Sequence, residues 1–350
     1  MGEPLRVGIV GIGTIATQYL ATIDSLADLH LVAVSDLDMT RAQAVADARP
    51  GVLALTTPNL LQRDDVDVVL NLTTPAEHVT VALAAIGAGR GVYNEKPLAT
   101  NTVDGRRIVE AASAAGVRLG CAPDTVLGTG TQTARRAIDD GLIGTPIAAT
   151  ATMVTPGHER WHAAPDFYYQ PGGGPLFDMG PYYLSALVTL LGPVSSVTGM
   201  TSRMRDSRVI QTGDRAGTVI PVRVDSHVTA LLRHDSGAIS TVVMSFDAVG
   251  TRASSIEVHG ESGTLTVPDP NRFGGSLSHI RSGEPAWTEE ACEQPPEVAR
   301  GVAVIDLAEC IVSGDEPAAS GSDALHVLDI LLCILESAAS GQHVTPSARP

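Results

Sequence analysis

The stretch VGIVGIGTIA, residues 7–16, decides the fold of this chain. A short apolar run leads into Gly11, whose missing side chain suits the tight turn that follows a strand. Gly13 allows a backbone to approach a pyrophosphate closely, and Ala16 fills the third, close-packing position of a G-x-G-x-x-A pattern. The stretch therefore predicts a dinucleotide-binding Rossmann domain whose phosphate-contacting residues are Gly11, Gly13, Thr14 and Ile15.

The sequence that follows this loop keeps the pattern of a Rossmann domain. Short apolar runs alternate with longer amphipathic segments as far as Cys121, which is typical of βα units on a parallel sheet. Helices are predicted at Val79–Ala88 and Val103–Ala115, and right-handed crossovers then give a doubly wound α/β sheet. The predicted strands are Arg6–Val10, Leu31–Ser35, Val52–Leu55, Val66–Leu72, Gly91–Asn94 and Val117–Cys121.

The composition changes after Pro123. Runs rich in Thr, Val and Ser with period-two alternation predict a large, mostly antiparallel open sheet. These strands are Ile147–Val154, Val194–Met204, Val219–Leu232 and Ala238–Phe246, and the predicted helices are Gly130–Asp140, Phe177–Leu191, Val302–Ser313 and Asp323–Ser340. We therefore expect two domains, a Rossmann domain at residues 1–123 and an α+β domain for substrate binding and oligomerisation at residues 124–350.

Bulk properties narrow the class of partner. A formal net charge of -16 without clustered Lys and Arg disfavours nucleic acid and anionic membranes, so a small molecule fits better. No leader segment and no membrane-spanning apolar run is recognisable, and we expect a cytoplasmic protein. The spacing of the four cysteines argues against a zinc site or a disulfide framework: Cys121, Cys292, Cys310 and Cys333.

An acidic residue follows the second predicted strand. Asp36 stands about twenty residues after Ala16, where a carboxylate hydrogen-bonds the ribose hydroxyls of NAD and repels a 2′-phosphate. The alternative role, capping the helix that begins near Met39, suits Asp38 better. Arg41 favours NADP if its guanidinium reaches that phosphate. We expect NAD, with NADP the weaker alternative.

Two further strand ends carry candidate site residues. Thr73, Thr74 and Pro75 follow the fourth strand at the carboxyl edge of the sheet, where ligands bind in such folds. His78 lies in the first turn of the next helix, where it contacts the cofactor or is satisfied by backbone groups. Glu95 and Lys96 close the fifth strand ahead of a proline, which places an acid and an ammonium beside the cofactor.

The motifs GIGTIA (11–16), TTPAEH (73–78) and EKP (95–97), in this order and spacing, resemble those of the glucose-fructose oxidoreductase, inositol dehydrogenase and rhizopine-catabolism (Gfo/Idh/MocA) family. The similarity spans nearly the whole chain. The resemblance implies that Lys96 is a catalytic residue that orients and polarises the substrate oxygen. Glu95 would then steady Lys96 or a cofactor hydroxyl.

The segment GGGPLFDMGPYY, residues 172–183, resembles the second signature of the family, a glycine run followed by an Asp and a proton-transfer residue four positions later. Residues four apart share a helix face, so Asp178 and Tyr182 point together. Most members have His at the position of Tyr182, although some resemble this chain in using Tyr. A phenol needs a neighbouring ammonium to act as a base at neutral pH, so Tyr183 and His162 remain alternatives. The structural alternatives are core packing for the tyrosines and an N-cap for Asp178.

The insert at residues 156–169 concentrates aromatic residues in a chain that is only 3% aromatic. Ring faces of a pyranose or cyclitol stack on such side chains, so the insert predicts a binding surface. An oligomer contact is the alternative. We predict no metal site, because no Cys, His or Asp cluster accompanies the histidines. Together with the helix signature, the predicted substrate-binding residues are His158, Trp161, His162, Tyr168, Asp178, Tyr182 and Tyr183.

The sequence thus predicts an NAD(P)-dependent oxidoreductase acting on a secondary alcohol or ketone of a sugar, glycoside or cyclitol. Its predicted catalytic residues are Lys96, Asp178 and Tyr182. A keto-sugar reductase of a biosynthetic pathway is the alternative within enzymes. A cofactor-binding regulator without turnover is the alternative outside them. A broad open sheet face has to be covered, so we expect a homodimer or homotetramer.

Overall fold

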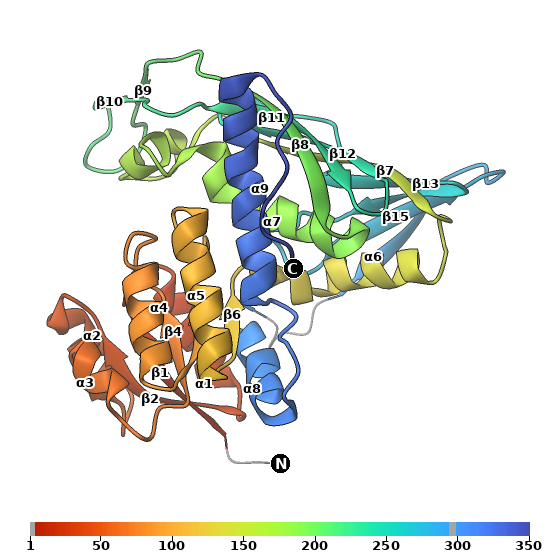
Figure 1. Cartoon of the computed structure of the whole chain (residues 1–350). Helices are drawn as coiled ribbons and strands as arrows, with labels where there is room; N and C mark the ends of the chain where they lie inside the picture. Colours follow the sequence, from red (N-terminus) through yellow and green to blue (C-terminus); the bar gives the residue numbers. More distant parts are fainter. Residues whose placement is uncertain (1–3, 294–298) are drawn as a thin grey trace. The chain divides into compact units, whose positions relative to one another are not determined.

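The computed structural model describes residues 4–293 and 299–350, and the chain divides into two compact units (Figure 1). The first unit comprises Met1–Leu127 and Gln294–Leu328, and the second comprises Gly128–Glu293 and Asp329–Pro350. The sequence predicts one boundary, after residue 123, whereas the first break between the units follows Leu127 and a later segment of the chain returns to the first unit.

The first unit contains a six-stranded parallel sheet with the order β3-β2-β1-β4-β5-β6. The predicted doubly wound sheet is confirmed, and its strand order reverses beside β1, where folds of this kind bind their ligands. The strands are β1 (Leu5–Val10), β2 (Leu29–Ser35), β3 (Leu53–Ala54), β4 (Val68–Asn71), β5 (Gly91–Asn94) and β6 (Leu119–Cys121). The helices are α1 (Ala16–Ser25), α2 (Met39–Asp47), α3 (Thr57–Leu61), α4 (His78–Gly87), α5 (Thr102–Ala115) and the short η1 (Asp124–Leu127).

Local sequence signals explain where several of these helices begin and end. Asp38 caps α2 by accepting a hydrogen bond from the Thr40 amide at 3.1 Å. Asn101 caps α5 in the same way, accepting from the Asp104 amide at 2.9 Å. Gly116 ends α5 in the left-handed conformation, with φ of 65°, which a glycine adopts without steric cost.

The segment that returns to the first unit is held by apolar packing. In helix α8 (Ala303–Ser313), the side chains of Val304 and Leu307 are fully buried in the same hydrophobic cluster as Val7 of β1. The backbone of this segment also joins the sheet region, since the Cys121 amide donates to the Ala319 carbonyl over 2.9 Å. This burial of apolar surface is the reason that a distant part of the chain completes the first unit.

The second unit contains an eight-stranded sheet with the order β16-β15-β14-β13-β7-β12-β11-β8. Only β7 and β12 pair in parallel, so the predicted large, mostly antiparallel sheet is confirmed. The strands are β7 (Pro146–Val154), β8 (Val194–Ser202), β11 (His227–His234), β12 (Ile239–Ser245), β13 (Ile256–Gly260), β14 (Gly263–Val267), β15 (Gly275–Arg281) and β16 (Thr288–Cys292). A separate hairpin pairs β9 (Ser207–Val209) with β10 (Val219–Pro221).

Of the element boundaries that differ from the sequence prediction, two change the interpretation of the second unit. The predicted strand Val219–Leu232 is two strands, because Pro221 has no N–H with which to continue the ladder of β10. Helix α7 (Gly174–Leu191) begins three residues before the predicted Phe177. Asp178 therefore lies inside α7, and its alternative role as an N-cap is wrong.

Helices cover one face of this sheet. Helix α7 contacts β7, β11 and β12, while α6 (Thr129–Asp139) contacts β14 and β15. Helix α9 (Gly321–Ser340) passes from the first unit into the second, and its Ser337 Oγ accepts from the Gly199 amide of β8 over 2.9 Å. Gly180 allows α7 to approach α9 closely, since an added Cβ would lie 2.6 Å from Leu331 Cδ2. None of the described helices combines the length and apolar character needed to cross a membrane.

Candidate active site

The phosphate loop lies between β1 and α1 in the first unit. Gly11 has φ of 99°, and an added Cβ would lie 2.7 Å from the Leu72 carbonyl carbon, so only glycine fits there. Gly13 is exposed, and nothing lies within 4 Å of where its Cβ would be. Ala16 is fully buried against the sheet. The loop thus has open space on the side where the G-x-G-x-x-A pattern places a pyrophosphate.

Asp36 lies directly after β2 and contacts the same loop. Its Oδ2 accepts from the Ile12 amide over 2.6 Å, and its Oδ1 accepts from the Asp38 amide over 2.8 Å. Arg41 lies against Asp38, with Nε 3.5 Å from Oδ2. The guanidinium that sequence left as a possible phosphate ligand therefore pairs with a carboxylate. The open loop and the half-exposed acid fit a dinucleotide.

The ends of β4 and β5 are joined by buried amides. Asn71 Nδ2 donates to Asn94 Oδ1 over 2.8 Å, and Thr73 Oγ1 donates to Asn71 Oδ1 over 2.6 Å. His78 is fully buried between the Pro97 carbonyl at 2.7 Å and the Thr73 carbonyl at 3.1 Å. Burial lowers the pKa of His78 below its ordinary value.

His78 therefore contacts the backbone of the loop from its buried side. This arrangement matches the alternative in which backbone groups satisfy His78, and not an exposed cofactor contact. Thr74 and Pro75, in contrast, are exposed at the carboxyl edge of the sheet.

Glu95 holds the turn that carries Lys96. Its Oε2 accepts from the Lys96 amide over 2.9 Å, and its Oε1 accepts from the Tyr19 hydroxyl over 2.7 Å. Tyr19 belongs to α1, directly after the phosphate loop, and is fully buried. Burial raises the pKa of Tyr19 well above its ordinary value, so the phenol remains a donor to Glu95. Sequence patterns do not reveal Tyr19, because it occupies an ordinary apolar position of an amphipathic helix.

One compositional signal for Lys96 is strong. Of the 23 Lys and Arg residues in the chain, Lys96 is the only lysine. A cation that merely pairs with an anion can be an arginine, and this chain uses arginine at every other basic position of that kind. A primary ammonium differs from a guanidinium in being able to give up a proton, so the exception points to chemistry at this position.

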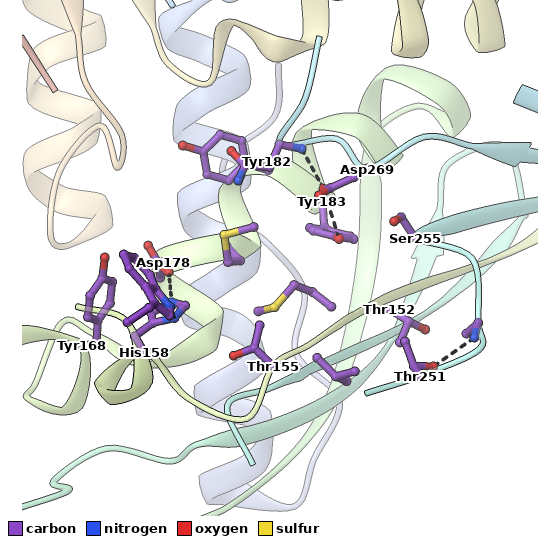
Figure 2. A pocket seen from close by; sticks show the side chains of 16 residues that line it. Thr152, Thr155, His158, Tyr168, Asp178, Tyr182, Tyr183, Thr251, Ser255 and Asp269 are labelled. Atoms are coloured by element: carbon purple, nitrogen blue, oxygen red, sulfur yellow. Dashed lines mark hydrogen bonds and ion pairs between the residues drawn. The ribbon is translucent and has the colours of Figure 1, made fainter. Parts of the chain in front are cut away.

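The second unit contains a pocket of about 490 Å³ (Figure 2). It brings together Asp178, Tyr182 and Tyr183 of α7 with His158, Trp161 and Tyr168 of the aromatic insert. Sequence reasoning missed the rest of the lining, most of which comes from the end of β7 and from loops far apart in the chain: Thr152, Met153, Val154, Thr155, Met179, Thr251, Ala253, Ser255, Asp269 and Asn271.

A hydrogen-bonded chain runs through the insert to α7. Trp161 Nε1 donates to His158 Nδ1 over 3.2 Å, and His158 Nε2 lies 3.0 Å from Asp178 Oδ2. The indole can only donate, so Nδ1 accepts and the proton of the neutral ring resides on Nε2, where it is donated to Asp178. Both ring nitrogens of His158 are thus engaged within the protein, and Nε2 holds the carboxylate of Asp178 in place.

The insert is anchored by a buried polar group. The His158 amide donates to Tyr169 Oη over 3.0 Å, and that phenol donates in turn to the Glu159 carboxylate. Arg208 Nη1 donates to Glu159 Oε1 over 2.9 Å, and its side chain is only 1% exposed. Removing one partner of such a buried pair leaves an uncompensated charge, so this group fixes the backbone that carries His158.

The two alternatives to Tyr182 occupy other positions. The Tyr183 hydroxyl donates to Asp269 Oδ1 over 3.3 Å, and burial raises the pKa of Tyr183. His162 is not among the lining residues of the pocket, and its Nδ1 accepts from the Ala164 amide over 3.0 Å. In the described part of the chain, no three His, Cys, Asp or Glu side chains are grouped so as to hold a metal ion.

Comparison with known proteins gives two family matches and several full-length relatives. Residues 5–122 match the oxidoreductase family with an NAD-binding Rossmann fold, and residues 131–266 match the GFO/IDH/MocA C-terminal domain. Inositol 2-dehydrogenase 3 of Saccharopolyspora erythraea is 30% identical over 280 residues, covering 77% of this chain and 75% of that protein. The 1,5-anhydro-D-fructose reductase of Ensifer adhaerens is 28% identical over 345 residues, covering 96% and 97%.

A crystal structure of an NAD binding oxidoreductase from Klebsiella pneumoniae superposes with a TM-score of 0.84 at 26% identity, covering 99% of each chain. The strand order, the phosphate loop and these matches agree with one another. They show that the chain belongs to the Gfo/Idh/MocA family of NAD-binding oxidoreductases.

Proposed function

We propose that this protein transfers a hydride between NAD and a secondary alcohol or ketone of a neutral sugar, glycoside or cyclitol. The observation that carries the proposal is the pocket of the second unit, where Asp178 and Tyr182 share one face of α7. Relatives named as an inositol 2-dehydrogenase, an anhydrofructose reductase and a D-apiose dehydrogenase support this class of substrate.

The first unit would hold the cofactor. Gly11, Gly13 and the start of α1 would take the pyrophosphate, and Asp36 would bind the adenine ribose. When bound, NAD would supply the hydride acceptor or donor. The choice of NAD over NADP rests on the carboxylates of Asp36 and Asp38, which repel a 2′-phosphate, and on the pairing of Arg41 with Asp38.

Three side chains would act on the substrate. Lys96 polarises the reacting oxygen, Tyr182 exchanges the proton with it, and Asp178 binds a neighbouring hydroxyl. Two other side chains position Lys96 and Asp178. The Glu95 carboxylate fixes the backbone of Lys96, and His158 orients the carboxylate of Asp178. The other cofactor-side contacts of the proposal are Thr14, Ile15, Thr73, Thr74 and Pro75.

The test is turnover of NAD⁺ with a panel of neutral cyclitols and pyranoses, followed by absorbance of the reduced nicotinamide, and the reverse reaction with the ketones. Lys96→Ala should lower kcat by roughly 10²- to 10⁴-fold while NAD affinity is largely kept. Lys96→Arg is the sharper variant, since it keeps the positive charge but replaces the compact ammonium by a planar guanidinium, which does not release a proton at neutral pH. Activity retained in both variants would refute the role of Lys96, and no turnover with any substrate would refute the function.

We also propose a homo-oligomer formed through the uncovered face of the eight-stranded sheet. Met200, Leu231 and Ile239 are 77%, 50% and 41% exposed on the adjacent strands β8, β11 and β12. In the register of these strands, Met200 faces Thr229 and Ile239 faces Arg233, on either side of Leu231. The three form one apolar strip, and such strips on stable proteins mark interfaces. A light-scattering mass equal to that of one chain would refute the oligomer.

A further inference from the structure

The pocket of the second unit has a polar end that the proposed reaction does not use. In Figure 2 His158, Tyr168 and Asp178 form one group at one end of the pocket, and Tyr182 and Thr155 lie between this group and the other labelled side chains. Along α7, Tyr183 follows Asp178 by five positions, roughly 7.5 Å at 1.5 Å per residue. The second group consists of Thr152, Tyr183, Thr251, Ser255 and Asp269.

A hydrogen-bonded chain organises this second end. The Tyr183 phenol, which is only 3% exposed, donates to Asp269 Oδ1 over 3.3 Å. The Asn271 amide donates to the same Oδ1 over 3.0 Å. Both bonds fall on one oxygen of the carboxylate, and no described residue donates to Oδ2 of Asp269. An oriented carboxylate oxygen therefore remains as an acceptor in the pocket lining.

The charge of the lining selects the class of ligand. The sixteen described residues that line the pocket include the two carboxylates of Asp178 and Asp269 and no Lys or Arg. A phosphate or a carboxylate on the ligand would meet like charges there. Hydroxyl groups, in contrast, donate to carboxylates and exchange hydrogen bonds with Ser and Thr. Met153, Met179 and Ala253 add apolar surface that suits the carbon face of a ring.

We propose that Asp269, oriented by Tyr183, is a second hydroxyl-binding subsite that takes the non-reacting ring of a neutral two-ring glycoside. The inference rests on the proposed function, since it takes the Asp178 end as the place where the substrate reacts. A single cyclitol or pyranose bound at Asp178 leaves the Asp269 end without a partner. Two linked rings satisfy both polar ends of one pocket of about 490 Å³.

The first experiment measures kcat/KM for one-ring and two-ring substrates. The one-ring probes are methyl α- and β-D-glucopyranoside, and the two-ring probes are trehalose, cellobiose and melibiose. Wild type should favour a two-ring probe, and Asp269→Asn should lower the two-ring to one-ring ratio about 10- to 100-fold, the scale of losing a hydrogen bond to a charged group. Glu261→Gln, an exposed carboxylate outside the pocket, is the matched control and should leave the ratio unchanged. A thermal melt verifies that each variant is folded.

The second experiment measures binding without turnover. Saturation-transfer NMR on the full chain should show contacts to both rings of the preferred disaccharide in wild type and to one ring in Asp269→Asn. Glucose 6-phosphate should not bind at this end. An unchanged ratio, equal contacts in both proteins, or no disaccharide preferred over a methyl glucoside would overturn the subsite. Two-ring contacts that depend on Asp269 without any nicotinamide turnover would leave the subsite standing and refute the proposed function.

Discussion

His158 Nε2 lies 3.0 Å from Asp178 Oδ2 and donates its proton to that carboxylate, because the other ring nitrogen accepts from the indole of Trp161. A residue in the aromatic insert thus sets the tautomer of a histidine and, through it, the orientation of an acid on α7. The rings of Tyr168 and Phe246 pack against His158 at centroid distances of 4.3 Å each and keep it in place.

Replacing Trp161 by Phe should therefore reduce kcat by roughly 2- to 10-fold, since it removes one neutral hydrogen bond of about 1 kcal/mol but keeps an aromatic ring. The ¹⁵N spectrum of labelled histidine should show loss of the fixed Nε2–H tautomer of His158. Trp287→Phe, at the other tryptophan of the chain, is the control and should change neither measurement. An unaltered tautomer in Trp161→Phe would contradict the relay.

Tyr182 and Tyr183 are adjacent but should respond differently to removal of the hydroxyl. Tyr182→Phe removes the proposed proton-transfer group and should lower kcat by roughly 10²- to 10⁴-fold. Tyr183→Phe removes a donor to Asp269 and should raise KM more than it lowers kcat. Steady-state kinetics of the two variants shows which tyrosine transfers the proton. The reverse order of effects would make Tyr183 the acid/base residue.

Substitutions at the two glycines of the phosphate loop should affect different properties, stability at Gly11 and NAD binding at Gly13. Gly11→Ala forces a side chain into positive φ and against the backbone of Leu72, so it should lower the free energy of unfolding by about 2 kcal/mol or more. Gly13→Ala meets open space and should leave stability nearly unchanged while weakening NAD binding. Chemical denaturation and calorimetric titration with NAD⁺ measure the two effects. Equal loss of stability in both variants would contradict this division.

Asp36 should control the choice of dinucleotide. Asp36→Ser removes a carboxylate that would repel a 2′-phosphate, so the NAD to NADP ratio of kcat/KM should fall at least about tenfold, equivalent to about 1.4 kcal/mol. Asp47→Ser, at the far end of α2, is the control and should keep the ratio of the wild type. A ratio that stays constant in Asp36→Ser would show that other groups select the cofactor.

Asp124 should make stability depend on pH in an unusual direction. Burial raises the pKa of this carboxyl to about 6, although Arg300 and the Gly301 amide oppose the shift. The pKa in the folded state then exceeds that in the unfolded chain, about 3.9, so the folded state holds the proton longer as pH rises. Relative to Asp124→Asn, the free energy of unfolding of wild type should fall by about 2 kcal/mol between pH 4 and pH 7.

Urea denaturation across that pH range measures this difference. Asp140→Asn, an exposed acid at the end of α6, should run parallel to wild type. A wild-type curve parallel to that of Asp124→Asn would show that the carboxyl titrates normally.

The sequence by itself determined the fold and the family of this protein. Residues 7–16, the strand ends and the signature on α7 each depend on local backbone chemistry, which a motif reports directly. Gly11 is an example, since positive φ and close approach to Leu72 both exclude a side chain. Period-two and helical spacing likewise identified β7, β12 and α7 to within a few residues.

Tertiary structure alone decided which side chains meet. Tyr19 reaches Glu95, Arg208 reaches Glu159, and Asp269 reaches Tyr183 across 76, 49 and 86 positions of the chain. Tertiary structure also decided that α8 returns to the first unit and that both ring nitrogens of His158 find partners. Such pairings follow from how buried polar groups find partners in the packed core, and no local pattern in the sequence carries that information.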